Sequence, residues 1–146
     1  METNRNRDPE TYEVIGAAMA VHHELGAGFL EDVYHEALMM EMNSRNIPFL
    51  HEVDLPIFYK GQRMQKVYRT DFLCFDTIIV ELKALPAVSG REKAQVINYL
   101  RASNYDRGLL LNFGSDSLHY TRLFNSKKKS DKSAKSVDNN PENNGS

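Results

Sequence analysis

The chain has 146 residues, of which 41% are hydrophobic, and a single cysteine, Cys74. This length suits one domain with its own core, and a lone cysteine excludes a disulfide within the chain, which favours a reducing compartment. The net charge of −2 argues against a protein that coats nucleic acid without sequence preference, because such binding needs many phosphate contacts. No apolar run reaches the roughly 18 residues of a membrane span, and the first ten residues lack the apolar region of a secretory signal. We therefore expect a soluble cytoplasmic protein with no membrane partner.

The composition divides the chain into three parts. Residues 1–9 are predicted to be flexible, and residues 10–124 to form the one folded domain. After Phe124 the chain is rich in Lys, Asn and Ser and has one branched aliphatic residue, Val137, which predicts a disordered tail over residues 125–146. Five lysines lie in this tail, and residues 1–126 carry 13 basic and 17 acidic groups, a net charge of −4. A nucleic-acid partner must therefore be held by a local basic patch.

The apolar periodicity predicts two helices first, over about residues 10–25 and 29–45. Three strands follow, over about 49–59, 66–74 and 77–82, and then a helix over about 91–103. The last two strands are predicted in "RGLLLNF" and "SLHYTRLF". The order ααβββαββ places an antiparallel hairpin beside a crossover helix, so the predicted fold class is α/β (α+β), with a mixed sheet flanked by helices.

The stretch "TIIVELK", residues 77–83, begins as a buried strand and ends in charge. Residues two apart on a strand share a face, so Glu81 and Lys83 are expected to point together. If the hairpin turns symmetrically about Asp76, Asp71 on the preceding strand lies opposite Glu81, with β-carbons about 4.5 to 5.5 Å apart. A turn shifted by one residue would break this register.

Two opposed carboxylates in an apolar hairpin repel each other, and a divalent cation between them would remove the repulsion. Oxygen ligands favour Mg²⁺ or Mn²⁺, and Lys83 could orient water or stabilise charge on a phosphate. In the alternative reading, Glu81 and Lys83 only solvate a strand end while Asp71 pairs with Arg69 or Lys83. For an arbitrary D…ExK pattern this alternative is the more frequent one.

Several blocks of the chain resemble one known family. "GFLEDVY", residues 28–34, resembles the signature of the GxxExxY proteins, and the later blocks follow in that family's order: "LPIFYKGQ", "YRTDFL", "IIVELKA", "AQVINYL" and "GLLLNFG". The resemblance covers about residues 10–124. The family is placed in the PD-(D/E)XK nuclease superfamily, whose core is αβββαβ with the metal site on the central hairpin. The resemblance therefore implies this fold with an extra N-terminal helix.

The resemblance also implies roles for single residues. Asp71 matches the first metal-binding aspartate of the superfamily, and Glu81 and Lys83 match its ExK element. Asp71, Glu81 and the Leu82 carbonyl would then hold one Mg²⁺, with Glu31 from the second predicted helix completing or extending the site. One metal or two remain open.

Three residues of the next helix are expected to contact substrate. Gln95 and Tyr99 resemble the QxxxY element of RecB-like nucleases and share one helix face, and Arg91 lies at the start of the same helix. One position departs from the pattern, since Thr70 stands where a proline usually precedes the aspartate.

The sequence thus predicts a metal-dependent phosphodiester hydrolase that acts on nucleic acid, with DNA as the expected substrate; a homodimer remains open. The alternative is a catalytically inactive nucleic-acid- or protein-binding module on the same fold. Gly28 and Tyr34 are expected to be structural. The five histidines are expected to be surface or core residues rather than zinc ligands, because no HExxH spacing exists.

Overall fold

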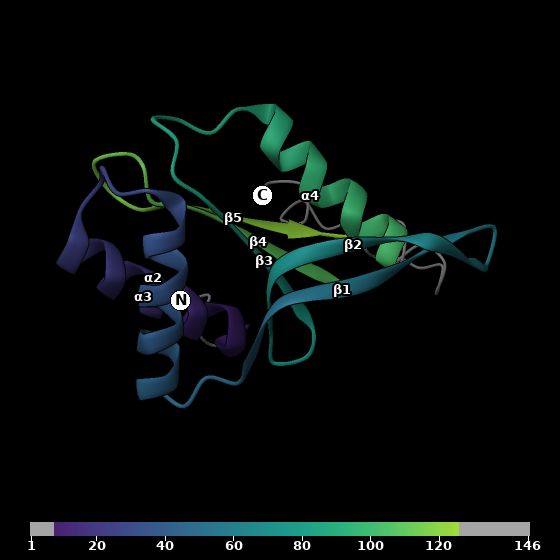
Figure 1. Ribbon diagram of the computed structural model, residues 1–146, viewed down its shortest axis with the longest axis horizontal. Helices are drawn as coiled ribbons and strands as arrows, with labels where there is room; N and C mark the ends of the chain where they lie inside the picture. Colours follow the sequence, from purple (N-terminus) through teal and green to yellow (C-terminus); the bar gives the residue numbers. More distant parts are fainter. Residues whose placement is uncertain (1–7, 126–146) are drawn as a thin grey trace.

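The computed structural model describes residues 8–125, and a five-stranded sheet with helices on both faces forms the molecule (Figure 1). In chain order the elements are α2 (Pro9–Leu25), α3 (Glu31–Ser44), β1 (Phe49–Tyr59), β2 (Gln62–Cys74), β3 (Ile78–Lys83), α4 (Gly90–Ser103), β4 (Arg107–Asn112) and β5 (His119–Phe124). The strands lie in the order β1-β2-β3-β4-β5, and only the β3–β4 pair is parallel. This mixed sheet confirms the predicted fold class and the order of its elements.

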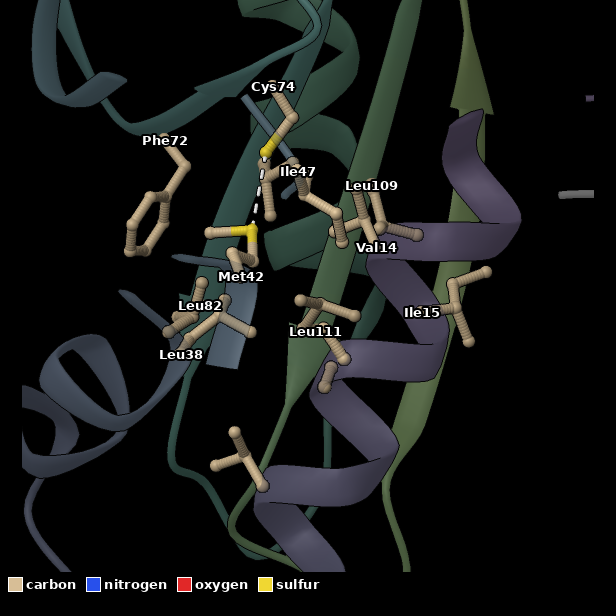
Figure 2. Close-up of a cluster of buried hydrophobic side chains, with 14 of the residues drawn as sticks. Val14, Ile15, Leu38, Met42, Ile47, Phe72, Cys74, Leu82, Leu109 and Leu111 are labelled. Atoms are coloured by element: carbon tan, nitrogen blue, oxygen red, sulfur yellow. Dashed lines mark hydrogen bonds between the residues drawn. The ribbon is translucent and has the colours of Figure 1, made fainter. Parts of the chain in front are cut away.

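The two faces of the sheet carry separate apolar cores. Helices α2 and α3 cover one face, where Val14, Leu38 and Met42 meet Leu109 and Leu111 from β4 (Figure 2). Helix α4 covers the other face, and its core includes Val96, Leu100, Ile79, Leu110 and Leu123. Successive residues of a strand point to opposite faces, so a continuous apolar run such as that of β4 fills both cores.

The β2–β3 hairpin has the register that the sequence predicts. Phe72 pairs with Val80, and Cys74 pairs with Ile78, which places the centre of the turn at Asp76. Phe75 and Asp76 both have positive φ, 54° and 60°, and the Thr77 N–H donates to the Cys74 carbonyl (3.1 Å), so a tight turn is followed by one extra residue, Thr77, before the Cys74–Ile78 pair. In this register Asp71 and Glu81 occupy the opposed positions directly beyond the last ladder pair.

Both strands of the β1–β2 ladder switch faces at one point. On β1, His51 lies against α3 whereas Val53 packs into the α4 core, although residues two apart share a face in a regular strand. Between them Glu52 has a φ of 57°, a conformation that residues other than glycine seldom adopt. On β2, Asp71 lies opposite Glu52 in the register and marks the same switch. The sheet is therefore irregular at the point where the candidate site lies.

The boundaries of the folded part differ slightly from the prediction. Asp8, placed in the flexible start, caps α2 by accepting from the Thr11 backbone N–H (3.2 Å) and pairs with Arg107 (2.7 Å). Asn125, placed in the disordered tail, is buried and donates to the carbonyls of Leu100 and Tyr105 (both 2.9 Å). The folded part therefore includes residues 8, 9 and 125, while the rest of the predicted flexible start and tail lies outside the described residues.

Two element starts also shift. Strand β2 begins at Gln62 rather than 66, because the exposed residues before Lys66 still pair across the hairpin with the end of β1. Helix α3 begins at Glu31 rather than 29, because Leu30 is extended. None of the helices within residues 8–125 combines the length and apolarity that a membrane span requires.

Candidate metal centre

Asp71 and Glu81 meet at the open end of the β2–β3 hairpin. The backbone N–H of Leu82 donates to Asp71 Oδ2 (2.8 Å), and the backbone N–H of Asp71 donates to Glu81 Oε2 (3.4 Å). Each carboxylate thus accepts a hydrogen bond from the opposite strand. These two bonds hold the strand ends together beyond the last ladder pair, and they bring both acidic side chains to one place.

Glu81 is held on its inner side by hydroxyl groups. Its Oε2 accepts hydrogen bonds from the Tyr68 hydroxyl and from Thr70 Oγ1 (3.1 Å). Burial, followed by the negative charge of Asp71, raises the pKa of Glu81 to about 8. Burial and the neighbouring Glu81 charge also raise the pKa of Tyr68, so its hydroxyl stays a donor. The Asp71 N–H donates to the same oxygen, Glu81 Oε2.

The Leu82 carbonyl faces the same place. The Lys83 carbonyl accepts a hydrogen bond from the Phe113 N–H (2.8 Å), on the β4 side of β3. Because backbone polar groups alternate in direction along a strand, the N–H and C=O of Leu82 point toward β2, and the N–H already binds Asp71. The two carboxylates are therefore brought together, and the Leu82 carbonyl is directed toward the strand that carries Asp71.

This set of donors fits a hard divalent cation. The ionised form of Glu81 is opposed by burial and by Asp71, and a cation would offset both costs. Oxygen ligands are those that Mg²⁺ and Mn²⁺ prefer.

Glu31 approaches this centre from α3 through a histidine. His35, one turn further on α3, has its Nε2 3.7 Å from Glu31 Oε2 and 3.8 Å from Asp71 Oδ2. The ligand atoms of these three residues lie within 4.8 Å of one another, and Glu31 is the most exposed of them at 46%. The structure thus brings Glu31 next to Asp71, on the side away from α4.

The start of α3 is fixed by the loop that precedes it. The Tyr34 hydroxyl donates to the Gly26 carbonyl and accepts from the Phe29 N–H (3.3 Å), while the Tyr34 ring stacks on Phe113. Gly28 has a φ of 112°, which suits a residue without a side chain. Gly28 and Tyr34 are therefore structural, as expected, and they position the first turn of α3, where Glu31 lies.

Lys83 follows Glu81 on the α4 face of β3, as the strand alternation predicts. The pKa of the Glu92 carboxyl, in the first turn of α4, lies below its usual range. Hydrogen bonds from the Ser89 backbone and hydroxyl cause most of this, and the Lys83 charge contributes. The positive charge of Lys83 therefore acts on the Glu92 carboxylate in the first turn of α4.

Gln95 and Tyr99 of α4 are linked to the centre through Tyr68, a residue of β2 that the sequence did not indicate. Gln95 Nε2 donates to the Tyr99 hydroxyl (3.1 Å), and the Tyr99 ring stacks on Tyr68 with centroids 3.4 Å apart. Tyr68 in turn donates to Glu81. Gln95 and Tyr99 therefore share a helix face as predicted, but their link to Glu81 is indirect. The Arg91 side chain is exposed in the first turn of α4.

Two of the histidines, expected to have no ligand role, lie together beside the centre. His35 Nδ1 is 2.9 Å from His51 Nε2, and both rings pack against Phe72. The i, i+4 spacing of Glu31 and His35 on one helix was the available signal for this arrangement. The contribution of His51 comes from a distant strand, which no local spacing indicates.

Comparisons with known proteins show the superfamily and the fold of this chain. The sequence matches the family model of the PD-(D/E)XK nuclease superfamily over residues 8–123, so the chain belongs to that superfamily. The crystal structure of SSO0001 is similar in fold, with a TM-score of 0.51 and 17% sequence identity; the match covers 73% of this chain and 61% of that one. None of the curated proteins matches this sequence. The superfamily includes nucleases, and the likeness to SSO0001 shows the fold alone.

Proposed function

We propose that this protein is a metal-dependent phosphodiester hydrolase that acts on nucleic acid, with DNA as its substrate. One observation carries the proposal: Asp71 and Glu81 meet at the open end of the β2–β3 hairpin, where the Leu82 N–H donates to Asp71 and the Asp71 N–H donates to Glu81. A protein that only binds nucleic acid has no need of two half-buried carboxylates whose negative charges repel each other. Membership of a nuclease superfamily points the same way.

Each residue of the centre has a distinct part in this proposal. Asp71, Glu81 and the Leu82 carbonyl would hold Mg²⁺ or Mn²⁺, which when bound supplies Lewis-acid polarisation of a phosphate oxygen and activation of water. The hydroxyls of Tyr68 and Thr70 hold the Glu81 carboxylate in place.

Lys83 carries the positive charge for the reaction. Lys83 follows Glu81 by two residues on β3, so the two side chains share the α4 face of the strand, where the ammonium would orient the attacking water or stabilise the charge that grows on the phosphate. Gln95, Tyr99 and Arg91 lie along the same side of α4 and would contact the substrate backbone.

The β1–β2 hairpin offers a local basic patch for the substrate. Lys60, Arg63 and Lys66 are exposed there, next to the exposed aromatic side chains of Phe58 (41%) and Tyr59 (64%). Cations of this kind neutralise phosphates, and aromatic rings stack on unpaired bases. This patch meets the requirement that an acidic domain must bind nucleic acid locally.

Within the superfamily, we propose that the chain is a GxxExxY protein. The three residues of that signature have separate tasks here. Gly28 allows the turn before α3, Tyr34 fastens that turn, and Glu31 faces the candidate centre. A signature that builds one wall of the centre is consistent with a family defined by it.

A cleavage screen tests the proposed activity. Purified protein is incubated with single-stranded, duplex and branched DNA and with RNA, in Mg²⁺ or Mn²⁺, beside Glu81→Ala and the exposed-acid control Glu24→Ala. We expect DNA cleavage that requires the metal, disappears in Glu81→Ala and persists in Glu24→Ala. Binding without cleavage of any of these substrates would overturn the proposal in favour of a binding module.

A further inference from the structure

An open cleft lies on the α3 side of Asp71, with a volume of about 630 Å³. Its walls come from α3, β1 and β2, and they hold His35, His51, Glu52 and Glu31 beside Asp71. Two of these side chains are imidazoles, which the hydrolytic centre at Glu81 does not use. The cleft is therefore chemically different from the oxygen-lined site on the other side of Asp71.

Three side chains in this cleft have the spacing of metal ligands. His35 Nδ1 and His51 Nε2 are 2.9 Å apart, and His51 Nε2 is 4.0 Å from Glu52 Oε2. One ligand atom from each of the three lies within 4.8 Å of the others. Two nitrogens at this separation can both bind one ion at metal–nitrogen distances of about 2.0 to 2.1 Å.

The irregular backbone at Glu52 creates this grouping. Adjacent residues of a regular strand point to opposite faces, so Glu52 would point away from His51. The φ of 57° at Glu52 instead turns its carboxylate toward the cleft. A glutamate in this conformation costs energy that the surrounding structure must offset, and such residues gather at functional sites.

The two imidazole rings are already oriented. Both pack against Phe72, with ring centroids 5.5 Å away for His35 and 4.7 Å away for His51. The side chains of His35 and His51 are 12% and 25% exposed, whereas Glu52 is 52% exposed. An ion can therefore enter from the Glu52 side and replace the proton that lies between His35 Nδ1 and His51 Nε2 in their hydrogen bond.

We propose that His35, His51 and Glu52 form a second metal site, which takes a nitrogen-preferring divalent transition-metal ion such as Zn²⁺. A set of two imidazole nitrogens and one carboxylate suits Zn²⁺ better than Mg²⁺, because Mg²⁺ prefers oxygen ligands only. The site goes beyond the proposed hydrolase activity, because none of its three ligands belongs to the Asp71–Glu81–Leu82 set and its occupancy does not depend on catalysis.

His35 connects the second site to the first. An ion on His35 Nδ1 fixes the tautomer with the proton on Nε2, and Nε2 faces both Asp71 Oδ2 (3.8 Å) and Glu31 Oε2 (3.7 Å). Histidine ligands commonly direct their second N–H to a carboxylate, which orients the ring and strengthens the metal bond. Occupancy of the second site would thus give Asp71 a fixed positive neighbour.

Metal titration separates the two sites. Chelator-treated full-length protein is titrated with Zn²⁺ by isothermal calorimetry, and Co²⁺ absorption reports imidazole ligation. We expect one Zn²⁺ per chain in the wild type, in Glu81→Gln and in the exposed-histidine control His23→Gln. His51→Gln and Glu52→Gln should weaken Zn²⁺ binding by at least about tenfold, since even partners outside the ligand shell matter that much.

Two results would overturn the second site. One is equal Zn²⁺ affinity in His51→Gln, Glu52→Gln and His23→Gln. The other is Zn²⁺ binding that Glu81→Gln abolishes and His51→Gln leaves intact, which would place the ion at the hydrolytic centre. Circular dichroism checks that each variant folds, and Glu52→Gln changes an exposed side chain in case His51→Gln loses stability. A chain that binds Zn²⁺ as expected but cleaves nothing would overturn only the proposed hydrolase.

Discussion

The two sides of Asp71 differ in chemistry although both begin at the point where the β2–β3 ladder ends. Toward α4, Glu81 is half-buried, bonded by the hydroxyls of Tyr68 and Thr70, and surrounded by oxygen atoms. Toward α3, His35 and His51 form a nitrogen-lined wall of an open cleft. The two sides differ in burial. On the α4 side, burial opposes the charge of Glu81, and a cation would offset that cost. On the α3 side, the cleft is open, so a metal ion can reach the side chains that line it.

The face switch in β1 and β2 produces this difference. If both strands were regular, Val53 would lie on the same face as His51, against α3. The switch at Glu52 and Asp71 instead places residues that are two apart on opposite faces, so that His51 lies against α3 and Val53 packs into the α4 core. Asp71 lies at the switch itself and can therefore contact Glu81 through its backbone and His35 through its carboxylate.

The comparison of the two sides of Asp71 can be tested by mutation, and the largest change in turnover is expected at Lys83, on the α4 side. Lys83→Met should lower turnover by about 10²- to 10³-fold, as loss of one catalytic electrostatic donor does. Binding of Mn²⁺ should survive, because Asp71 and Glu81 hold the ion, and losing a neighbouring positive charge favours a cation. Cleavage rates and calorimetric titration with Mn²⁺ measure the two properties, with Lys93→Met as the exposed-lysine control on α4. Wild-type turnover in Lys83→Met would remove Lys83 from the mechanism.

The next effect concerns the burial of Glu81 and depends on pH. In metal-free protein the folded pKa of about 8 exceeds the ordinary value of 4.5. Between these pH values the folded state keeps a proton that the unfolded state loses, so stability is full below pH 4.5 and falls as the pH rises to about 8. Unfolding by urea in the presence of chelator should show this loss, on the order of a few kcal/mol.

A matched variant isolates the contribution of Glu81. Glu81→Gln keeps the shape of the side chain but cannot ionise, so the loss of stability between pH 5 and 8 should largely disappear. Saturating Mn²⁺ should also restore wild-type stability at pH 8, because an ion that binds only the folded state stabilises it. An unchanged pH profile in Glu81→Gln would show that Glu81 does not set this dependence.

The sequence was sufficient for the fold and for half of the centre. Apolar periodicity defined the helices and strands, and the symmetric turn about Asp76 placed Asp71 opposite Glu81, because a short hairpin fixes its own register. The contact between Tyr68 and Glu81 was missed because it depends on the face switch in β2, which the regular alternation of a strand does not predict. His51 was missed because its partner, His35, comes from a helix 16 residues earlier in the chain.

A smaller effect is expected where the loop before α3 is fastened. Tyr34→Phe leaves the Gly26 carbonyl and the Phe29 N–H without this partner in a partly buried place, which should cost about 1 to 3 kcal/mol of unfolding free energy. The loss moves the first turn of α3 and should weaken the α3 side of the centre more than the α4 side. Chemical denaturation measures the cost, and Tyr120→Phe on β5, where the side chain is 45% exposed, is the matched control. Equal stability of Tyr34→Phe and wild type would contradict the structural role of the signature tyrosine.

The smallest effect is expected in the exposed part of the β1–β2 hairpin, where Lys66 lies on β2 five residues before Asp71. Lys66→Gln removes one exposed charge, so DNA affinity should fall by a few-fold for every sequence tested. The slope of log affinity against log salt should decrease by roughly 0.7 to 0.9, the contribution of one neutralised phosphate. Fluorescence anisotropy with chelator present measures binding without cleavage, and Arg101→Gln, which removes one exposed charge from the end of α4, is the control. If both variants change the slope equally, the hairpin is not the local basic patch; a change confined to Lys66→Gln assigns the phosphate contact to the hairpin.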